Sequence, residues 1–294
     1  MKNIMPADVP QHAYDHFKKN MSAITKNTDH LFLFAGDQKI EHLNADFYGN
    51  NIAPEAQHPE HLFNIASKGS IGAFATHVGL IARYGNHYKN VHYIAKLNGK
   101  TNLIPTEQRD PMSQQLWSVH DVLTFKEQSG LSICGVGYTI YLGSEYEPVM
   151  LTQAAQMIYQ AHQVGLVAIV WIYPRGKSVH NNNDTLIIAG AAGVAHALGA
   201  DFVKVQLPHD IQDTQLKPIV SAAGNTGVLC AGGQVQNTHD VCKRIELYMH
   251  NHCAGVAIGR NIFQHSTERA ITITHAIAAM IYKNKSAQEA STLL

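Results

Sequence analysis

The chain has 294 residues with 22 basic and 22 acidic side chains, so its formal net charge is zero when histidine is neutral. Hydrophobic residues make up 45% and charged residues 15%, which suits a large core and excludes disorder as the main state. Without a basic excess, nucleic acid is not expected as a partner. No apolar run reaches the roughly 20 residues of a membrane span, and the first residues hold no signal-peptide core, so no membrane association is expected.

Cysteine and histidine spacing gives no sign of a metal site. The cysteines form neither a disulfide framework nor a metal-binding knuckle, and they lie far apart at Cys134, Cys230, Cys242 and Cys253. Two short histidine pairs, at 58 and 61 and at 250 and 252, lack the H-E-x-x-H spacing of a zinc-binding helix. We therefore favour surface or capping roles for these histidines, and a reduced cytoplasmic protein.

A short apolar run followed by an amphipathic stretch recurs eight times along the chain. Near-continuous apolar runs are typical of parallel strands that are buried on both faces. In chain order, the expected strands are 31–35, 71–77, 91–97, 131–138, 166–173, 201–206, 227–231 and 255–258.

Helix signals stand between these strands. The segments 152–164 and 238–250 carry apolar residues at helical spacing. Asp184 is placed to cap the start of a helix over 185–198, and Gly199 is placed to end it. Eight βα units in about 260 residues predict one α/β domain, a (β/α)8 or TIM barrel, with a doubly wound open sheet as the alternative. We expect residues 1–28 to be an N-terminal extension and 285–294 a C-terminal tail.

Barrels of this kind carry their chemistry at the C-terminal ends of the strands, so the residues that end each strand are the candidates. Asp37 follows the first strand and is either an acid, a base or a hydroxyl ligand, or else a turn cap. Lys96 ends the third strand, and Lys204 lies between two valines of the sixth. A lysine in an apolar strand is either functional or paired with an inward carboxylate.

The fifth strand places an aromatic face at the mouth of the predicted barrel. Because strand side chains alternate, Trp171 and Tyr173 share one face with Ile169. The phenol of Tyr173 and the guanidinium of Arg175 are then expected to line the pocket. An ordinary aromatic packing layer is the alternative for Trp171.

Glycines follow the seventh and eighth strands, where barrels often bind phosphate. Gly232 and Gly233 come after one strand, and Gly259 and Arg260 after the other. Glycines let backbone N–H groups approach an anion, and arginine forks onto its oxygens. The two loops together predict a phosphorylated ligand.

A strand-end lysine with a tyrosine, an aspartate and a phosphate site is the set that a Schiff-base aldolase needs. Free lysine, with a pKa of ~10.4, is neutral about once in 2,500 molecules at pH 7, so the amine must be helped to lose its proton. A second inward lysine on another strand would help, because a nearby cation favours the neutral amine.

Five segments of this sequence match a known family. They are GDQKIEH at 36–42, KLNGKT at 96–101, WIYPRG at 171–176, GADFVK at 199–204 and GVAIGRNIF at 255–263. Over about residues 32–263 the chain resembles the archaeal-type class I fructose-bisphosphate aldolases, a Schiff-base family. The resemblance implies a TIM barrel that uses neither metal nor other cofactor and that assembles as a higher homo-oligomer.

The resemblance also implies roles for individual residues. Lys204 would form the Schiff base, Tyr173 would be the general acid/base, and Asp37 would hold or deprotonate a substrate hydroxyl. The expected substrate-binding residues are Trp171, Arg175, Gly232, Gly233, Gly259, Arg260, Lys96 and His42. The expected reaction, a step of glycolysis and gluconeogenesis, is reversible cleavage of fructose 1,6-bisphosphate to dihydroxyacetone phosphate and glyceraldehyde 3-phosphate.

One departure and two alternatives accompany this expectation. Relatives often have serine before the Gly-Gly pair, whereas this chain has Ala231, so we expect weaker phosphate binding. One alternative is another Schiff-base aldolase or transaldolase-type enzyme that acts on a different phosphorylated keto-sugar. The other is a phosphate-binding barrel that works as an isomerase or a non-catalytic binder, in which Lys204 is only an ion-paired structural residue.

Overall fold

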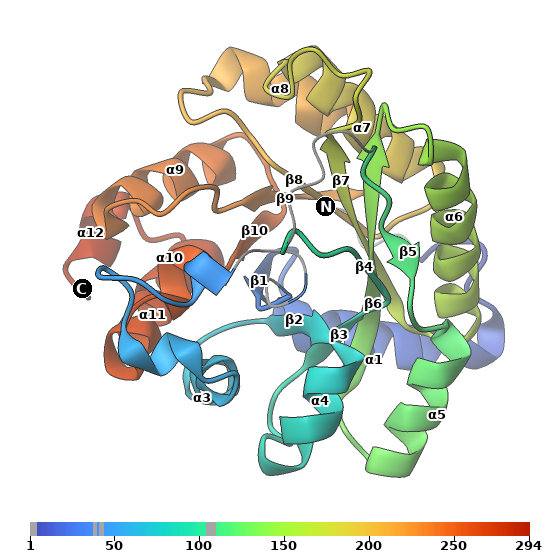
Figure 1. The fold of residues 1–294 in the computed structure, drawn as a ribbon, viewed down its shortest axis with the longest axis horizontal. Coiled ribbons are helices and arrows are strands. Elements are labelled where there is room, and N and C mark those ends of the chain that lie inside the picture. The colour runs from blue at the N-terminus through green and yellow to red at the C-terminus, as the bar shows by residue number, and fades with distance from the viewer. Residues whose placement is uncertain (1–4, 38–39, 41–43, 104–109) are drawn as a thin grey trace.

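Eight parallel strands close into a barrel in the computed structural model, which describes residues 5–37, 40, 44–103 and 110–294 (Figure 1). Around the barrel the strands follow the order β1, β10, β9, β8, β7, β6, β3, β2. Their bounds are β1 Leu31–Ala35, β2 Ala73–His77, β3 Tyr93–Lys96, β6 Ile133–Leu142, β7 Val167–Pro174, β8 Phe202–Val205, β9 Gly227–Ala231 and β10 Gly255–Ile258. The predicted (β/α)8 barrel is confirmed, and the open doubly wound sheet is excluded.

All eight strands lie where the apolar runs predicted them, because a parallel strand in a barrel is buried on both faces. The bounds of β1, β9 and β10 agree with the prediction. The largest difference is β6, which was expected to end at Tyr138 but continues to Leu142. Its last residues stay paired with β7, Tyr141 beside Tyr173 and Leu142 beside Pro174.

Helices surround the strands (Figure 1). They are α1 Tyr14–Thr25, α3 Glu60–Lys68, α4 Val78–Tyr84, α5 Val119–Ser129, α6 Glu147–Gln163, α7 Thr185–Ala197, α8 Asp213–Ala222, α9 Thr238–His250, α10 Arg260–Phe263, α11 Thr267–Lys283 and α12 Ala287–Ser291. A separate two-stranded sheet pairs β4 Asn98–Gly99 with β5 Gln114–Gln115. In the described part of the chain, no helix is long and apolar enough to span a bilayer.

Local signals explain where helices begin and end. The Asp184 carboxylate accepts a hydrogen bond from the backbone N–H of Leu186 at 2.9 Å and so caps α7, as expected. Gly199 follows this helix with φ +89°, a conformation that favours glycine. The predicted bounds of α9 are confirmed, whereas α6 begins at Glu147, five residues before the predicted start at 152.

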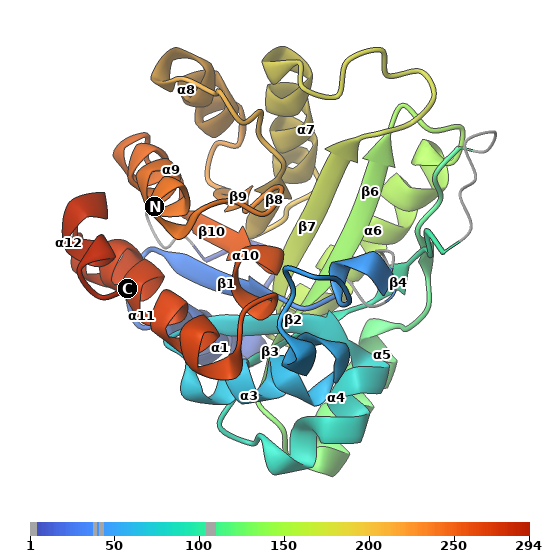
Figure 2. The same cartoon turned by 60° about the vertical axis from the view of Figure 1, so that its left-hand side comes forward.

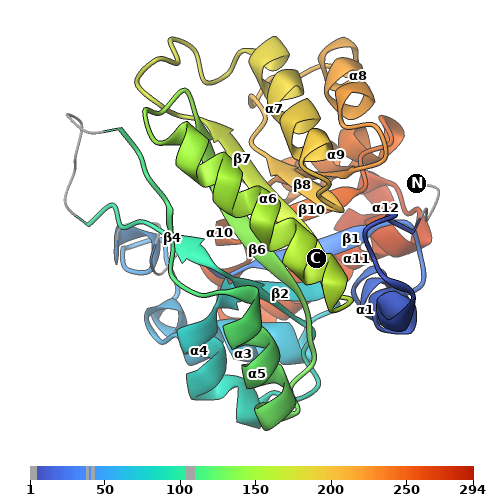
Figure 3. The same ribbon diagram turned by 90° about the vertical axis from the view of Figure 1, so that its right-hand side faces the viewer.

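The terminal helices pack onto the barrel. At the end of the barrel where strands begin, α1 lies against β1, β6 and β7 and buries Phe17 and Ile24. This close approach depends on Gly165, because a Cβ there would lie 2.7 Å from the His16 side chain. On the outer layer, α6 crosses β6 and β7 (Figure 3), and α12 packs against α9 and α11 (Figure 2).

Candidate active site

A cavity of about 70 Å³ opens at the C-terminal mouth of the barrel. It collects residues from the ends of six strands of the barrel, β1 and β6 to β10, together with Asn102 from the segment after β4, and only the closed barrel brings these together. Its lining residues are Asp37, Asn102, Tyr141, Tyr173, Arg175, Lys204, Gln206, Ala231, Gly232, Gly233, Ala257, Gly259 and Arg260. Eight of the predicted site residues therefore share one cavity, and Lys96 and Trp171 are buried beside it. The remaining one, His42, lies outside the described residues.

Lys204 faces the barrel interior near the end of β8. Its neighbours Val203 and Val205 point to the opposite face because strand side chains alternate. The residue is 7% exposed, and its Nζ lies 5.6 Å from the centre of the Trp171 ring. An amine in this position is shielded from bulk water yet open to the cavity.

Lys96 is fully buried next to the same indole. Its Nζ lies 3.5 Å from Oδ2 of Asp37 and 5.0 Å from the centre of the Trp171 ring. Gly137, the register partner of Lys96, makes room for the indole, because a Cβ on it would lie 2.3 Å from Cζ3 of Trp171. The Trp171 ring thus lies within 6 Å of two lysine Nζ atoms, and it is fully buried beside the cavity.

The wall formed by the ends of β6 and β7 is aromatic and carries a cation. Tyr173 and Tyr141 are register partners on β7 and β6, with ring centres 6.3 Å apart. The guanidinium carbon of Arg175 lies 4.7 Å from the centre of the Tyr173 ring. One Arg175 nitrogen donates a hydrogen bond to the Gln206 side chain at 2.5 Å, which fixes the guanidinium over the phenol.

Sequence reasoning missed Tyr141 and Gln206. Tyr141 lies beyond the expected end of its strand at Tyr138, so it was not considered. Gln206 is two residues after Lys204, and the alternation of strand side chains was the signal that places both on one face.

The loops after β9 and β10, which were predicted to bind phosphate, line the same cavity with Gly232, Gly233, Gly259 and Arg260, and we call these four residues the cradle. Gly233 adopts φ +68°, which favours glycine. Arg260 donates a hydrogen bond to the carbonyl oxygen of Gly233 at 3.0 Å, and its other terminal nitrogen lies 3.5 Å from the Asp46 carboxylate. Ala231 lines the cavity with a methyl group where a serine would offer a hydroxyl. The cradle therefore relies on backbone groups and arginine.

Asn261 ties the two loops together and was also missed. Its side-chain amide donates to the carbonyl oxygens of Gly232 and Gln234 at 3.2 and 3.1 Å. Its side-chain oxygen accepts the backbone N–H of Gln236 at 2.8 Å. The asparagine sits in the predicted GVAIGRNIF segment, but only the folded barrel shows that it reaches the other loop.

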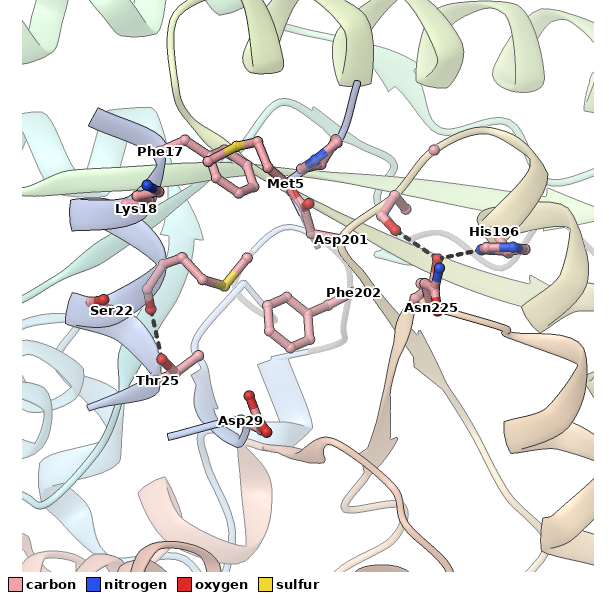
Figure 4. A pocket seen from close by; sticks show the side chains of 15 residues that line it. Met5, Phe17, Lys18, Ser22, Thr25, Asp29, His196, Asp201, Phe202 and Asn225 are labelled. Atoms are coloured by element: carbon pink, nitrogen blue, oxygen red, sulfur yellow. Dashed lines mark hydrogen bonds between the residues drawn. The ribbon is translucent and has the colours of Figure 1, made fainter. Parts of the chain in front are cut away.

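A larger cavity, of about 450 Å³, lies at the other end of the barrel (Figure 4). Met5, Phe17 and Phe202 give it an apolar lining, and α1 forms one side. Among the described residues that line it, none was predicted as a site residue. The residues that were predicted to take part in catalysis, Lys204, Tyr173 and Asp37, instead line the smaller cavity at the mouth.

The sequence pattern of the DeoC/LacD family aldolases matches residues 31–265. A curated relative from Methanocaldococcus jannaschii, named fructose-bisphosphate aldolase/6-deoxy-5-ketofructose 1-phosphate synthase, is 52% identical over 97% of this chain and 92% of its own. A relative from Thermoproteus tenax, named fructose-bisphosphate aldolase class 1, is 33% identical over 87% of this chain and 91% of its own.

Two solved structures extend this likeness to the fold. A fructose-bisphosphate aldolase from Slackia heliotrinireducens has a TM-score of 0.96 and 43% identity, covering 99% of this chain and 93% of that one. An archaeal fructose-1,6-bisphosphate aldolase, with its catalytic lysine covalently bound to the carbinolamine intermediate, has a TM-score of 0.78 and 30% identity, covering 90% and 99%. Because the family pattern spans most of its length, the chain belongs to the DeoC/LacD family of aldolases.

Proposed function

We propose that this protein is a class I fructose-bisphosphate aldolase that cleaves its substrate reversibly through a Schiff base on Lys204. The observation that carries the proposal is the single cavity in which a shielded lysine amine, a phenol and a carboxylate stand beside a glycine-rich cradle. The names of the relatives from two archaea support the same reaction.

Binding comes first. The phosphate next to the ketone lies in the cradle of Gly232, Gly233, Gly259 and Arg260, which places the C2 carbonyl at Nζ of Lys204. The neutral amine attacks C2, and the carbinolamine loses water to give an iminium ion. Lys96 favours the neutral amine of Lys204, because two ammonium groups close to one indole repel each other.

Carbon–carbon cleavage follows. Tyr173 removes the proton of the C4 hydroxyl as the C3–C4 bond breaks, and the electron pair moves through C3 to the iminium nitrogen. Glyceraldehyde 3-phosphate leaves and an enamine remains. The Arg175 guanidinium over the ring stabilises negative charge on the phenol oxygen. Tyr173 then returns its proton to C3 of the enamine, and hydrolysis of the resulting iminium ion by water releases dihydroxyacetone phosphate and restores the amine.

Asp37 holds the substrate in this scheme. Its side chain is 4% exposed, and its Oδ2 lies 3.5 Å from Nζ of Lys96. An ionised carboxylate at the cavity wall accepts hydrogen bonds from sugar hydroxyls. It therefore orients the ketose so that the C3–C4 bond lies beside Tyr173.

Borohydride trapping tests this function. Wild-type protein reduced with sodium borohydride in the presence of fructose 1,6-bisphosphate should gain a covalent adduct, which peptide mapping places on Lys204. Lys204→Met should give no adduct, whereas the exposed-lysine control Lys68→Met should trap like wild type. Trapping at the wild-type level in Lys204→Met would refute the assignment.

Another phosphorylated keto-sugar is the less favoured substrate, because the names of these relatives include fructose-bisphosphate aldolase. The relative from Methanocaldococcus jannaschii also carries the name of a 6-deoxy-5-ketofructose 1-phosphate synthase. Such a product has its phosphate on C1 alone. Comparing kcat/KM for fructose 1,6-bisphosphate and fructose 1-phosphate therefore separates the two: a clear preference for the bisphosphate supports the aldolase.

We also propose that the enzyme works as a higher homo-oligomer in the cytoplasm. On α7, Leu186 and Ile187 are 74% and 38% exposed, and neighbouring exposed apolar side chains are typical of contact surfaces. The four cysteines are free thiols, which suits a reducing compartment. Light scattering checks the assembly, and a monomer mass would contradict it.

A further inference from the structure

Arg244 places a cation directly behind the phosphate cradle. It lies in α9, the helix that follows the cradle loop, and helix side chains lean towards the N-terminus of their helix. Its Nη1 atom is 3.7 Å from the point where a Cβ on Gly233 would stand. Its Nε and Nη2 atoms are shielded from solvent and have no hydrogen-bond partner in the described part of the chain. The guanidinium therefore touches the back of the loop whose front faces the cavity.

Two titratable groups near this guanidinium, Tyr248 and Cys230, are neutral. Its central carbon lies 5.6 Å from the centre of the Tyr248 ring. Burial raises the pKa of the Tyr248 phenol and of the Cys230 thiol, so both neighbours stay neutral near pH 7. Among the described residues, no carboxylate forms an ion pair with Arg244, although a shielded cation is costly when it has no counter-ion.

A small cavity next to this arginine shares part of its wall with the active-site cavity. It measures about 10 Å³, and its lining includes Arg244, Gln236, Ala231 and Gly232, of which the last two also line the active-site cavity. The side-chain oxygen of Gln236 is buried here without a partner in the described structure. The space suits one water molecule, which would satisfy hydrogen bonds but would leave the charge of Arg244 uncompensated.

The arginine of the cradle, Arg260, lines the active-site cavity itself, whereas Arg244 does not. Arg260 already has the Asp46 carboxylate at 3.5 Å and the Gly233 carbonyl oxygen at 3.0 Å. Ala231 contributes no hydroxyl donor. An incoming phosphate dianion thus meets a partly neutralised arginine in front and an uncompensated one behind the glycines.

We propose that the substrate's phosphate group is the counter-ion of Arg244, which acts on it through the glycine turn at Gly232 and Gly233. This inference rests on the proposed function, because it assumes that the ligand of the cradle is a sugar phosphate. A charge acting over one layer of backbone strengthens phosphate binding and leaves the imine chemistry to the residues of the cavity.

Arg244→Gln tests the inference, with inorganic phosphate as the probe and the exposed Arg83→Gln as the matched control. Isothermal titration should show phosphate binding about tenfold weaker in Arg244→Gln, as expected for a charge several ångströms from the anion in a partly buried site. Arg244→Lys should restore most of the affinity, because it restores the charge. The ligand-free melting temperature of Arg244→Gln should equal or exceed that of wild type, since an unpaired cation is removed.

Unchanged phosphate affinity in Arg244→Gln would overturn the inference, and a lower melting temperature with unchanged affinity would assign the arginine a purely structural role. If the glutamine variant fails to fold, Arg244→Met serves the same purpose. Borohydride trapping at saturating fructose 1,6-bisphosphate separates this inference from the function. If the wild-type protein is trapped but Arg244→Gln binds phosphate as tightly as wild type, only the role of Arg244 is contradicted. If Arg244→Gln binds phosphate more weakly but the wild-type protein gives no trapped adduct, only the aldolase function is contradicted.

Discussion

The two ends of the barrel each bury a cationic side chain beside carboxylates, with different geometry. At the end where strands begin, the His162 ring lies between two carboxylates, with Nδ1 2.8 Å from Asp8 and Nε2 3.2 Å from Asp201. Both ring nitrogens must donate, so the ring is an imidazolium. Asp201 also accepts the backbone N–H of Ala168 at 2.8 Å. This cluster ties the segment before α1 to the barrel wall.

At the mouth, two lysine amines approach one ring face. Nζ of Lys96 lies 3.5 Å from Oδ2 of Asp37 and 5.0 Å from the centre of the Trp171 ring, and Nζ of Lys204 lies 5.6 Å from the same centre. At one end, then, a ring between two carboxylates ties segments of the fold together, whereas at the other end two amines share one indole. Because an amine is the nucleophile that attacks a carbonyl, we expect the first arrangement to serve stability and the second to serve reactivity.

Tyr173→Phe should have the largest effect at the mouth and almost none on the fold. It removes the proposed proton acceptor but keeps the ring, so cleavage should fall by about 10²–10⁴-fold. Imine trapping on Lys204 should persist, because the amine is untouched. Steady-state cleavage, borohydride trapping and thermal unfolding are the measurements, with the exposed Tyr159→Phe as control. Cleavage within a few fold of wild type would exclude Tyr173 as the proton acceptor.

Lys96→Met should show that this end also contains a structural ion pair. Removing Lys96, which is fully buried, takes away the ammonium group that lies 3.5 Å from the Asp37 carboxylate. The free energy of unfolding should fall by about 3–5 kcal/mol, measured by urea denaturation. The double variant Lys96→Met/Asp37→Asn should recover most of this loss, because it also removes the carboxylate charge that faced Lys96. A single variant as stable as wild type would mean that the Lys96–Asp37 contact adds nothing to stability.

The sequence predicted the strands well because burial on both faces leaves a strong apolar pattern. β9 and β10 are clear cases. β6 extends beyond its predicted end at Tyr138, because Thr139 and Tyr141 interrupt the apolar pattern although the strand remains paired with β7. The apolar pattern that marks a strand is therefore least reliable at the strand ends, where polar residues line the cavity.

The site residues also divide into those that stand out in the sequence and those that only the fold reveals. Lys96 and Lys204 were detectable because a lysine inside an apolar strand is anomalous. Arg244 and Asn261 were not, since an arginine in an amphipathic helix and an asparagine after a glycine-arginine pair are ordinary in sequence. Their positions behind and between the cradle loops come from tertiary packing alone.

A variant of the cluster of Asp8, His162 and Asp201 at the N-terminal face should have the smallest effect on stability, and this effect should depend on pH. Burial opposes the protonation of His162, but the hydrogen bonds and charges of Asp201 and Asp8 outweigh it and raise the pKa above the usual histidine value. A raised pKa in the folded state stabilises the fold fully below the unfolded pKa of about 6.5. That stabilisation is lost as the pH rises through the higher folded pKa.

Asp8→Asn should therefore destabilise the protein more in mild acid than in base. Because the Asp8 side chain is 37% exposed, solvent screening limits the loss to about 1 kcal/mol near pH 6. In base, once the pH exceeds the folded pKa of His162, the ring is neutral in both proteins, so the difference from wild type should shrink towards zero. Urea unfolding in mild acid and in base measures it. Asp15→Asn, an exposed carboxylate on α1, should change stability by the same small amount at both. A loss for Asp8→Asn that grows with pH would show that His162 is not held as an imidazolium, and the contrast between the two ends would disappear.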